Sequence, residues 1–368
     1  MHLVFFSWKD ITHPKAGGAE VLSHELMKRC VSDGHTVTLV TSAYKGGEPE
    51  TVHAGYRIIR RGNMYTSWWH AFFYYQKNLR GNCDIVIEQM NTTAYLARLY
   101  TEEPSILFIH QLTKEVWDFE LFWPASWFGK YLYEPLVLWL QRKNTVITVS
   151  NSTKQDLCSY GFAAEKIHII SEGVDIEPVS DVSTIEKYHA PTLLCLGAAR
   201  PMKRTSDAIT VFETVKKHLP DLQLHMAGDY TGEHGDAVHR QAAQSPYAED
   251  ITIHGRVSDT KKQTLMQRSH IIIVTSIREG WGLIVTEANS QGTIAGVYNV
   301  PGLRDSVQAG NSGIVANNNN PIELGNMIAA TLTDPKLYRK LQHNAWEWSK
   351  NITFEQSYRD FKSVLKNL

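Results

Sequence analysis

The sequence predicts an α/β protein with two doubly wound domains in tandem. Short apolar runs rich in β-branched residues alternate with longer stretches of helical period, the pattern of a parallel sheet with helices on both faces. The alternation stops once, in a polar segment with two prolines at 177–191, and then starts again. A chain of 368 residues is long enough for two such domains, each with its own core.

The first half of the chain shows this pattern from its first residues. Strands are expected at Leu3–Phe6, Thr36–Thr41, Tyr56–Arg60, Asp84–Glu88, Ile106–His110, Thr145–Ser150 and Lys166–Ile170. Helical stretches stand between several of them, including Ala19–Asp33 and Lys154–Tyr160. Strands joined through a helix pair in parallel, so their carboxyl ends meet at one edge of the sheet.

The second half repeats the pattern. Strands are expected at Thr192–Leu196, Leu222–Ala227, Asp250–His254, Ile271–Thr275, Thr293–Tyr298 and Gly313–Ala316, and helices at Thr205–His218, Asp259–Gln267, Leu283–Ser290 and Pro321–Leu332. The predicted organisation is a Rossmann-like domain over 1–176, a linker over 177–191, a second Rossmann-like domain over 192–345, and a helical segment over 346–368 that packs back on the first domain. Such a pair has a cleft between its domains, and ligands bind beyond the carboxyl ends of the strands.

Composition narrows the class of protein. Hydrophobic residues make up 43% of the chain and charged residues 20%, which is typical of a soluble globular protein. The net charge of −1 argues against a nucleic-acid-binding protein, which would carry a basic excess. The chain shows neither a basic leader with an apolar region nor a run near the ~18 apolar residues of a membrane span. We therefore expect a cytoplasmic protein, with peripheral membrane attachment left open.

The stretch Arg278–Ala288 carries the clearest chemical signal. An apolar strand ends near Ser276, a turn containing Gly280 and Gly282 follows, and a helix begins near Leu283. The free N–H groups and the dipole at a helix start favour a phosphate, and glycines let the backbone approach it closely. An ordinary strand, turn and helix with acidic residues on the surface would have the same sequence pattern. The turn by itself is therefore weak evidence for a phosphate site.

Two glutamates flank this turn. Glu279 precedes the helix and Glu287 lies on it, and EGWGLIVTEA resembles the Glu-x7-Glu signature of glycosyltransferase family 4, whose members are retaining enzymes with the GT-B fold. The resemblance implies that Glu279 contacts the donor sugar and Glu287 the ribose hydroxyls. It also implies that the donor diphosphate is held by the intervening residues Gly280, Trp281, Gly282, Leu283 and Ile284.

Further stretches resemble the same family, in the same order along the chain. Gly17 and Gly18 resemble its glycine-rich loop after the first strand, which binds the donor. His110, at a strand end, matches the active-site histidine, although a histidine there can also be a structural hydrogen-bonding residue. Glu172–Asp175 resembles the motif before the linker, with glutamate replacing the usual asparagine, and Val300–Asp305 resembles the later glycine motif.

The family usually grips the diphosphate with an arginine and a lysine after the first strand of the second domain. Lys203 falls on the lysine position, but Ala198 occupies the arginine position. Arg200 or Arg204 is left to supply the second cation, and Arg200 is favoured because Arg204 opens the following helix. Two cations neutralise charge on the leaving diphosphate, so no metal or other cofactor is expected. Arg256 is either a contact to the nucleotide base, as in family members, or a surface arginine.

The prediction that results is a hexosyltransferase acting with retention, with His110 and Glu279 as catalytic residues. It would move a sugar from a UDP- or GDP-sugar, bound by the second domain, to a glycan, lipid-linked or small-molecule acceptor bound by the first, as in polysaccharide biosynthesis. Two alternatives stay open: a GT-B nucleotide-sugar epimerase, and a catalytically silent sugar-nucleotide-binding protein. The matching Glu279, Glu287, Lys203 and His110 count against the silent protein, and Ala198 keeps it open. The motifs concern diphosphate and ribose, so they specify neither base, sugar nor acceptor.

Two aromatic stretches in the first half stand apart from these motifs. Tyr65–Arg80 and Trp117–Lys143 both mix tryptophan, tyrosine and phenylalanine with scattered lysine and arginine. Such residues suit the interfacial zone of a bilayer or a lipid-linked acceptor. They equally suit a core or a carbohydrate groove. Peripheral contact of the N-terminal domain with the inner face of a membrane is therefore one of two interpretations.

Overall fold

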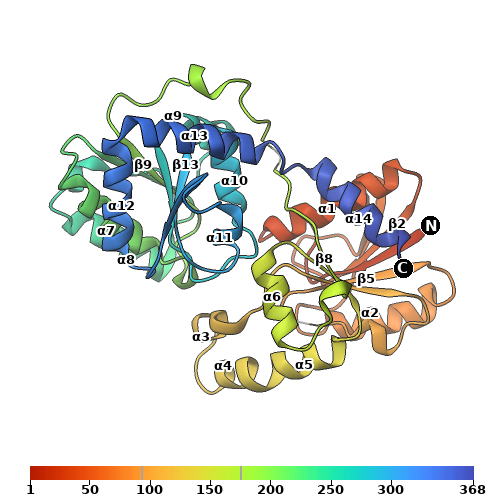
Figure 1. Ribbon diagram of the computed structural model, residues 1–368. Helices are drawn as coiled ribbons and strands as arrows, with labels where there is room; N and C mark the ends of the chain where they lie inside the picture. The colour runs from red at the N-terminus through yellow and green to blue at the C-terminus, as the bar shows by residue number, and fades with distance from the viewer. Residues whose placement is uncertain (93, 175) are drawn as a thin grey trace. The chain divides into compact units, whose positions relative to one another are not determined.

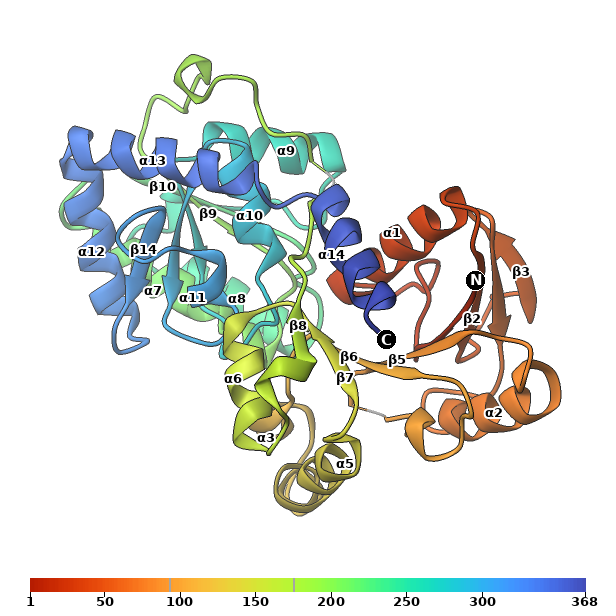
Figure 2. The same ribbon diagram turned by 45° about the vertical axis from the view of Figure 1, so that its right-hand side comes forward.

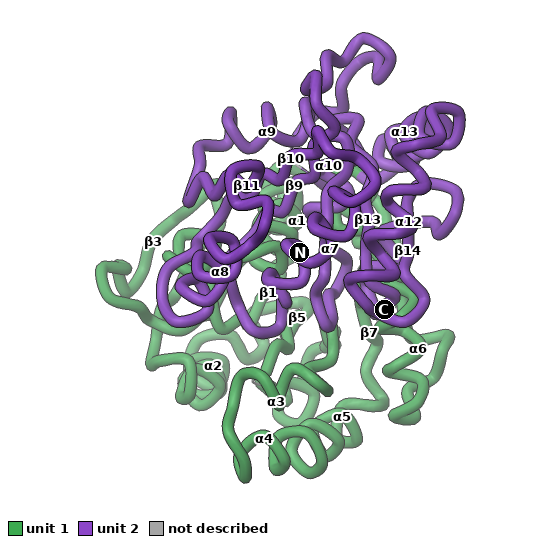
Figure 3. Tube along the Cα trace, turned by 90° about the vertical axis from the view of Figure 1, so that its left-hand side faces the viewer, with its two compact units in different colours: residues 1–173, 353–368 green, residues 174–352 purple. Residues whose placement is uncertain are grey.

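The computed structural model describes residues 1–92, 94–174 and 176–368, which form two compact units. Unit 1 comprises residues 1–173 and 353–368, and unit 2 comprises residues 174–352 (Figure 3). Asp175, part of a motif noted above, lies outside the described residues. The chain therefore completes most of unit 1, then all of unit 2, and returns to unit 1 for its last helix.

Unit 1 is built on an eight-stranded sheet in the order β3-β4-β2-β1-β5-β6-β7-β8 (Figure 1). Its strands are β1 (His2–Phe6), β2 (Thr36–Thr41), β3 (Glu50–His53), β4 (Tyr56–Arg60), β5 (Ile85–Met90), β6 (Ser105–Ile109), β7 (Thr145–Thr148) and β8 (Ile167–Ile169). The paired strands are parallel except β3 with β4. β3 is the strand that the sequence does not predict, because Val52 is its one apolar residue and is 70% exposed.

Helices cover both faces of the unit 1 sheet. They are α1 (Gly18–Ser32), α2 (Ser67–Tyr74), α3 (Trp117–Glu120), α4 (Ala125–Phe128), α5 (Glu134–Gln141), α6 (Asn151–Ser159) and α14 (Phe354–Lys366). On one face Phe5 of β1 contacts Phe361 of α14, with ring centroids 6.3 Å apart. On the other face Val4 of β1 packs in a cluster with Ala71 of α2. Each side of β1 is therefore buried, as its continuous apolar sequence predicts.

The last helix is fastened to unit 1 by its polar side chains as well as its apolar face. The Tyr358 hydroxyl donates to Asp33 Oδ2 at 2.9 Å, and Lys362 Nζ donates to the same oxygen at 2.9 Å. The Ser357 hydroxyl donates to the main-chain oxygen of Ser171 at 2.5 Å. These bonds join α14 to Asp33, directly after α1, and to Ser171, near the end of residues 1–173.

Unit 2 is built on a six-stranded parallel sheet in the order β11-β10-β9-β12-β13-β14. Its strands are β9 (Thr192–Leu196), β10 (Gln223–Ala227), β11 (Ile251–Ile253), β12 (Ile271–Val274), β13 (Ile294–Tyr298) and β14 (Gly313–Ala316). Its helices are α7 (Thr205–Lys216), α8 (Gly232–Gln244), α9 (Asp259–Arg268), α10 (Leu283–Ser290), α11 (Leu303–Ser306), α12 (Pro321–Thr333) and α13 (Pro335–Ser349). Among these, α8 has no clear sequence signal, because two glycines and many polar residues obscure its period.

The segment 177–191, expected as a linker, is attached to unit 2. Lys187 Nζ donates to the main-chain oxygens of Gln267, Ser269 and Gly292 at 2.8, 2.7 and 2.8 Å. Burial lowers the pKa of Lys187 to about 7. A polar segment without a sustained period is typical both of a linker and of an extended strap across a domain surface, which is why the sequence pattern does not distinguish them.

None of the helices within the described residues has the length and apolar character needed to cross a bilayer.

Candidate functional site

Lys203 and Glu279 meet at the carboxyl edge of the unit 2 sheet. The turn that follows β12 brings Glu279 Oε1 to 2.5 Å from Lys203 Nζ. The Ser276 hydroxyl donates to the same carboxylate oxygen at 2.6 Å. Both charged side chains keep some contact with solvent, so the ion pair is accessible to a ligand. Two residues predicted from separate motifs thus form one polar group.

The loop that carries Lys203 is bonded to the segment after β12, the strand next to β9. The Thr275 hydroxyl donates to the main-chain oxygens of Lys203 and Arg204 at 3.1 and 3.0 Å. The Ile277 N–H donates to the Met202 oxygen at 2.8 Å. These bonds fix the backbone on both sides of the ion pair, which is the condition for presenting an ammonium group at a defined place.

The glycine turn leads into α10 as the sequence predicts, and a neighbouring loop supports it. Gly282, the residue before the helix, has a φ of +93°, a conformation that favours glycine. A Cβ atom added at Gly302 would lie 2.2 Å from the main-chain oxygen of Glu279. The Glu279 N–H donates to the Pro301 oxygen at 3.2 Å. The predicted Val300–Asp305 motif therefore helps to hold the Glu279 turn in place.

Trp281 and its neighbours occupy different positions within this turn. The indole N–H of Trp281 donates to Thr286 Oγ1 at 2.9 Å, and its ring is buried. Gly280, Leu283 and Ile284 are only partly buried. Because the first N–H groups of a helix lack partners within it, the start of α10 offers donors at the surface here. Trp281 thus supports the turn from inside, while Gly280, Leu283 and Ile284 lie nearer to solvent.

Glu287 and Arg256 are each paired with a residue that the motifs do not contain. Lys262 Nζ, on α9, lies 2.5 Å from Glu287 Oε2. Arg256 donates to Asp229 Oδ2 at 2.7 Å and is largely exposed. Hydrogen bonds from the Thr231 hydroxyl and from Arg256 lower the pKa of Asp229. Sequence reasoning missed Lys262 and Asp229, because a lysine on a polar helix and an aspartate after a strand form no recognisable spacing with their partners.

The structure separates the two arginines that compete for the second cation position. Arg204 Nη2 lies 2.6 Å from Asp207 Oδ2, and its guanidinium lies over the Tyr298 ring at 5.1 Å from the centroid. Arg200 is exposed, and within the described residues it forms no ion pair. Arg204 is thus engaged with α7 and β13, and Arg200 is the cation with freedom to meet a ligand near Lys203.

His110 lies in unit 1, directly after β6, and both of its ring nitrogens have partners. Nδ1 lies 2.6 Å from Glu172 Oε1, and Nε2 lies 3.0 Å from the side-chain nitrogen of Gln89. A carboxylate only accepts hydrogen bonds, so this network assigns the proton of the neutral ring to Nδ1 and leaves Nε2 as the acceptor. Gln89 is fixed in turn by the Ser23 hydroxyl, which donates to its oxygen at 3.1 Å. The glutamate that replaces the family asparagine therefore orients the histidine.

The glycine pair Gly17 and Gly18 opens α1, and a side chain of the same turn already occupies its free end. The Gly17 N–H donates to Glu20 Oε2 at 2.7 Å, and Lys9 Nζ lies 3.6 Å from that oxygen. A carboxylate at a helix start is favourable for the same reasons as a phosphate. An anionic ligand at Gly17 would therefore compete with Glu20 for this position.

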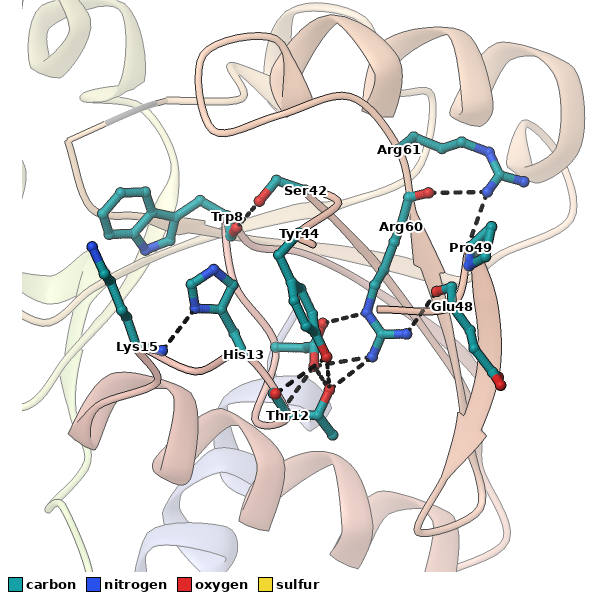
Figure 4. Close-up of polar contacts among 11 residues, drawn as sticks. Trp8, Thr12, His13, Lys15, Ser42, Tyr44, Glu48, Pro49, Arg60 and Arg61 are labelled. Carbon is teal, nitrogen blue, oxygen red and sulfur yellow. Dashed lines mark hydrogen bonds and ion pairs between the residues drawn. The ribbon is translucent and has the colours of Figure 1, made fainter. Parts of the chain in front are cut away.

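A buried ion pair holds the loop between β1 and α1 (Figure 4). Arg60 Nε lies 2.8 Å from Asp10 Oδ2, and Arg60 also donates to Thr12 Oγ1 at 2.9 Å. The Tyr44 hydroxyl lies 2.7 Å from the Thr12 hydroxyl (Figure 4). Although burial opposes it, the hydrogen bonds from Arg60 and Thr12 lower the pKa of Asp10. These residues fix the segment that leads to Gly17, and no sequence motif identifies them.

Two family models match the chain, one over most of the first stretch of unit 1 and one over most of unit 2. The model described as Glycosyltransferase Family 4 matches residues 16–178, and the model described as Glycosyl transferases group 1 matches residues 182–348. The two Rossmann-like units, together with the solved structures that resemble the chain, define the fold class as that of GT-B glycosyltransferases. The chain belongs to glycosyltransferase family 4.

Individual relatives are distant in sequence. Sucrose-phosphate synthase from Thermosynechococcus elongatus has a TM-score of 0.81 at 17% identity, with 100% of this chain and 98% of that chain covered. HepE from Anabaena in complex with UDP and glucose has a TM-score of 0.74 at 15% identity, with 100% of both chains covered. Glycogen synthase of Mycobacterium tuberculosis is 25% identical over 199 residues, which are 54% of this chain and 48% of the relative. The chain spans about half the length of this curated relative.

Proposed function

We propose that the protein is a retaining glycosyltransferase that moves a hexose from a nucleoside-diphosphate sugar, UDP- or GDP-linked, to a glycan, lipid-linked or small-molecule acceptor. The observation that carries this proposal is the ion pair of Lys203 with Glu279 beside the glycine turn of unit 2. It places a cation, a carboxylate and a helix start together, which is what a diphosphate joined to a sugar requires.

Each group of the donor has a counterpart in unit 2. Lys203 and Arg200 would neutralise the diphosphate as it departs, and the start of α10 would add N–H donors. Glu279 would accept hydrogen bonds from sugar hydroxyls and Glu287 from the ribose, while Arg256 would lie against the base. The protein's own cations would carry this charge, so the reaction is proposed to need no metal.

Unit 1 would supply the acceptor side of the reaction. His110 is proposed to hydrogen-bond the donor sugar or the reacting region through Nε2, in exchange for its contact with Gln89. Glu172 would hold the ring at Nδ1, at 2.6 Å. Gly17 and Gly18 would approach the donor once Glu20 gives up its bond to the helix start. We further propose that the enzyme acts in the cytoplasm, in polysaccharide biosynthesis, with unit 1 in contact with the inner face of a membrane.

UDP is the first nucleotide to test, because the structural relative HepE is described in complex with UDP and with UDP-glucose. Purified protein would be screened by thermal shift against UDP, GDP and ADP and their common hexose conjugates, with and without a chelator. A ligand that binds the folded protein raises its Tm by mass action. We expect one base to be preferred, the chelator to make no difference, and the Lys203→Met variant to lose the shift.

Product analysis then separates the proposal from its rivals. Release of the nucleoside diphosphate that depends on an added acceptor, with the anomeric configuration of the donor kept in the product by NMR, supports retaining transfer. Conversion of the donor into its epimer without an acceptor would identify an epimerase. Tight binding with neither transfer nor slow hydrolysis would identify a silent sugar-nucleotide-binding protein. No thermal shift with any nucleotide at millimolar concentration would refute the donor site itself.

A further inference from the structure

One face of the unit 1 sheet is covered by helices that are apolar on both sides. Strand register places Val4, Val86, Leu107 and Val146 on the same face, because residues paired across parallel strands point the same way. Val4 and Val86 pack with α2, and Leu107 and Val146 pack with α5. Helices α2 and α5 therefore lie on one side of the sheet, opposite α1 and α14 (Figure 1, Figure 2).

The outer surface of α2 and of the helical segment 125–141, which ends in α5, is aromatic. We call it the aromatic face and define it by six side chains that are 41–56% exposed: Trp68, Trp69, Phe73, Trp127, Tyr131 and Trp139. The segment from α4 to α5 also buries Val137 and Leu138 against the sheet. A surface helix normally has one apolar stripe, turned to the core. The aromatic face is a second apolar stripe, and the described residues of unit 1 leave its six side chains exposed.

Lysine and arginine outnumber exposed carboxylates around the aromatic face. The stretches 65–82 and 117–143 contain five lysines and arginines, and Lys77, Arg142 and Lys143 among them are exposed. They contain three carboxylates, and two of these, Asp118 and Glu120, are exposed. Asp118 Oδ2 lies 2.5 Å from Lys130 Nζ, and the third carboxylate, Glu134, is 2% exposed. The surface beside the rings therefore keeps an excess of positive charge.

We propose that the aromatic face docks unit 1 on an anionic lipid bilayer. Tryptophan and tyrosine prefer the boundary between headgroups and acyl chains, where the ring is apolar and its N–H or O–H group meets water. Exposed lysine and arginine beside such rings are attracted to anionic headgroups, and surface carboxylates would oppose this. Helices that lie in the boundary bury one face to a shallow depth without crossing the membrane. A second copy of the chain is the competing occupant.

This inference deepens the membrane contact proposed above, and its test is separate from sugar transfer because vesicle binding needs no donor. The full chain would be sedimented with phosphatidylcholine vesicles, with and without phosphatidylserine. We expect binding that strengthens with phosphatidylserine and weakens with salt. Vesicles containing brominated lipid should also quench tryptophan fluorescence, because only rings within the boundary come close to the acyl chains.

Two variants and a matched control identify the docking face. Trp69→Ser with Trp127→Ser and Trp139→Ser should abolish binding to both kinds of vesicle. Lys77→Glu with Arg142→Glu and Lys143→Glu should weaken binding to anionic vesicles by about fivefold or more per cation, from ~1 kcal/mol each. The control reverses two exposed charges on α14, Arg359 and Lys366, to glutamate and should bind as the original protein does.

Circular dichroism and the thermal shift with nucleotide show whether each variant is folded, so loss of folding is not mistaken for loss of docking. The proposal is overturned if the original protein does not sediment with anionic vesicles, or if the tryptophan variant sediments as strongly as the original. It is also overturned if sedimentation velocity shows a dimer that the tryptophan variant dissolves while vesicle binding is absent. Intact transfer to a soluble acceptor without vesicle binding would refute docking and leave the transferase proposal standing.

Discussion

The ion pair of Lys203 and Glu279 predicts both the direction and the magnitude of the change in nucleotide affinity when either residue is replaced. If Lys203 binds the donor diphosphate, then it must exchange Glu279 for a phosphate oxygen when the ligand arrives. Lys203→Met should weaken UDP or GDP binding, because a charged hydrogen bond contributes ~1.5–3 kcal/mol. That loss corresponds to about 10- to 150-fold in Kd, since ~1.4 kcal/mol is tenfold.

Glu279→Gln should have the opposite effect on the same measurement. The Lys203 and Glu279 side chains are 34% and 16% exposed, so the pair is partly screened and contributes ~1 kcal/mol or less. Removing the carboxylate frees Lys203 and removes repulsion of the phosphates, so affinity for the nucleoside diphosphate should rise by up to about fivefold. Transfer of the sugar should nevertheless fall, because the amide cannot replace the carboxylate toward the sugar hydroxyls.

Isothermal titration calorimetry of the two single variants and the double variant measures both effects and their coupling. The control is Lys217→Met, which removes an exposed lysine at the other end of α7, ~18 Å along a helix of 12 residues. The reasoning is refuted if Lys203→Met binds the nucleoside diphosphate as well as the control does, or if Glu279→Gln weakens it. Either result would remove the pair from the diphosphate site.

Three further predictions concern other parts of the molecule. Arg200→Ala should weaken nucleoside diphosphate binding in the same calorimetric assay, whereas Arg204→Ala should mainly lower the Tm, because only Arg204 is engaged with α7. Gly302→Ala should cost ~1–3 kcal/mol of stability and reduce the nucleotide-induced thermal shift, because its Cβ would lie 2.2 Å from a main-chain oxygen. The control Gly310→Ala, also at positive φ but with open space around it, should leave that thermal shift unchanged. Burial raises the pKa of Glu88 from 4.5 to about 7. Its contribution to the free energy of unfolding is therefore complete below about pH 4.5 and is lost as the pH rises through 7. Over that pH range the urea midpoint of the Glu88→Gln variant should change less than that of the original protein.

The sequence predicted the sheets well because parallel strands are buried on both faces. Strands β2, β4, β9 and β14 have the predicted bounds, and each is a short run between turn residues. The prediction was incomplete where burial is one-sided or absent. β3 is exposed at the sheet edge, and the segments α3 to α5 form a helical layer whose aromatic residues gave no clear period. The hydrophobic pattern of a segment reflects which of its residues are buried, so helices and strands at the surface have a weaker pattern in the sequence.

The sequence predicted the backbone features of the candidate site better than the partners of its charged side chains. Glycine turns, strand ends and helix starts are local features, so Gly282, Glu279 and the start of α10 follow from adjacent residues. The partner of a charged side chain is set by the fold instead. Lys262 reaches Glu287 from another helix, and Glu172 reaches His110 from the end of another strand. No spacing along the chain encodes such pairs, which is why they appear only in three dimensions.

These partners bear on how unit 2 would bind its donor. Lys203, Lys262 and Arg256 each lie within 2.7 Å of a carboxylate oxygen, so these three cations, unlike Arg200, are already paired within the protein. A phosphate that takes an ammonium group away from its carboxylate leaves that carboxylate free to accept hydrogen bonds from hydroxyl groups. A nucleoside diphosphate with ribose and sugar hydroxyls supplies both the anion and the donors. Inorganic diphosphate supplies the anion alone, so Glu279 and Glu287 lose their lysine partners and gain no hydroxyl donor in exchange. The same exchange therefore favours a whole sugar nucleotide over its parts, and it does so without any residue that is specific for one sugar.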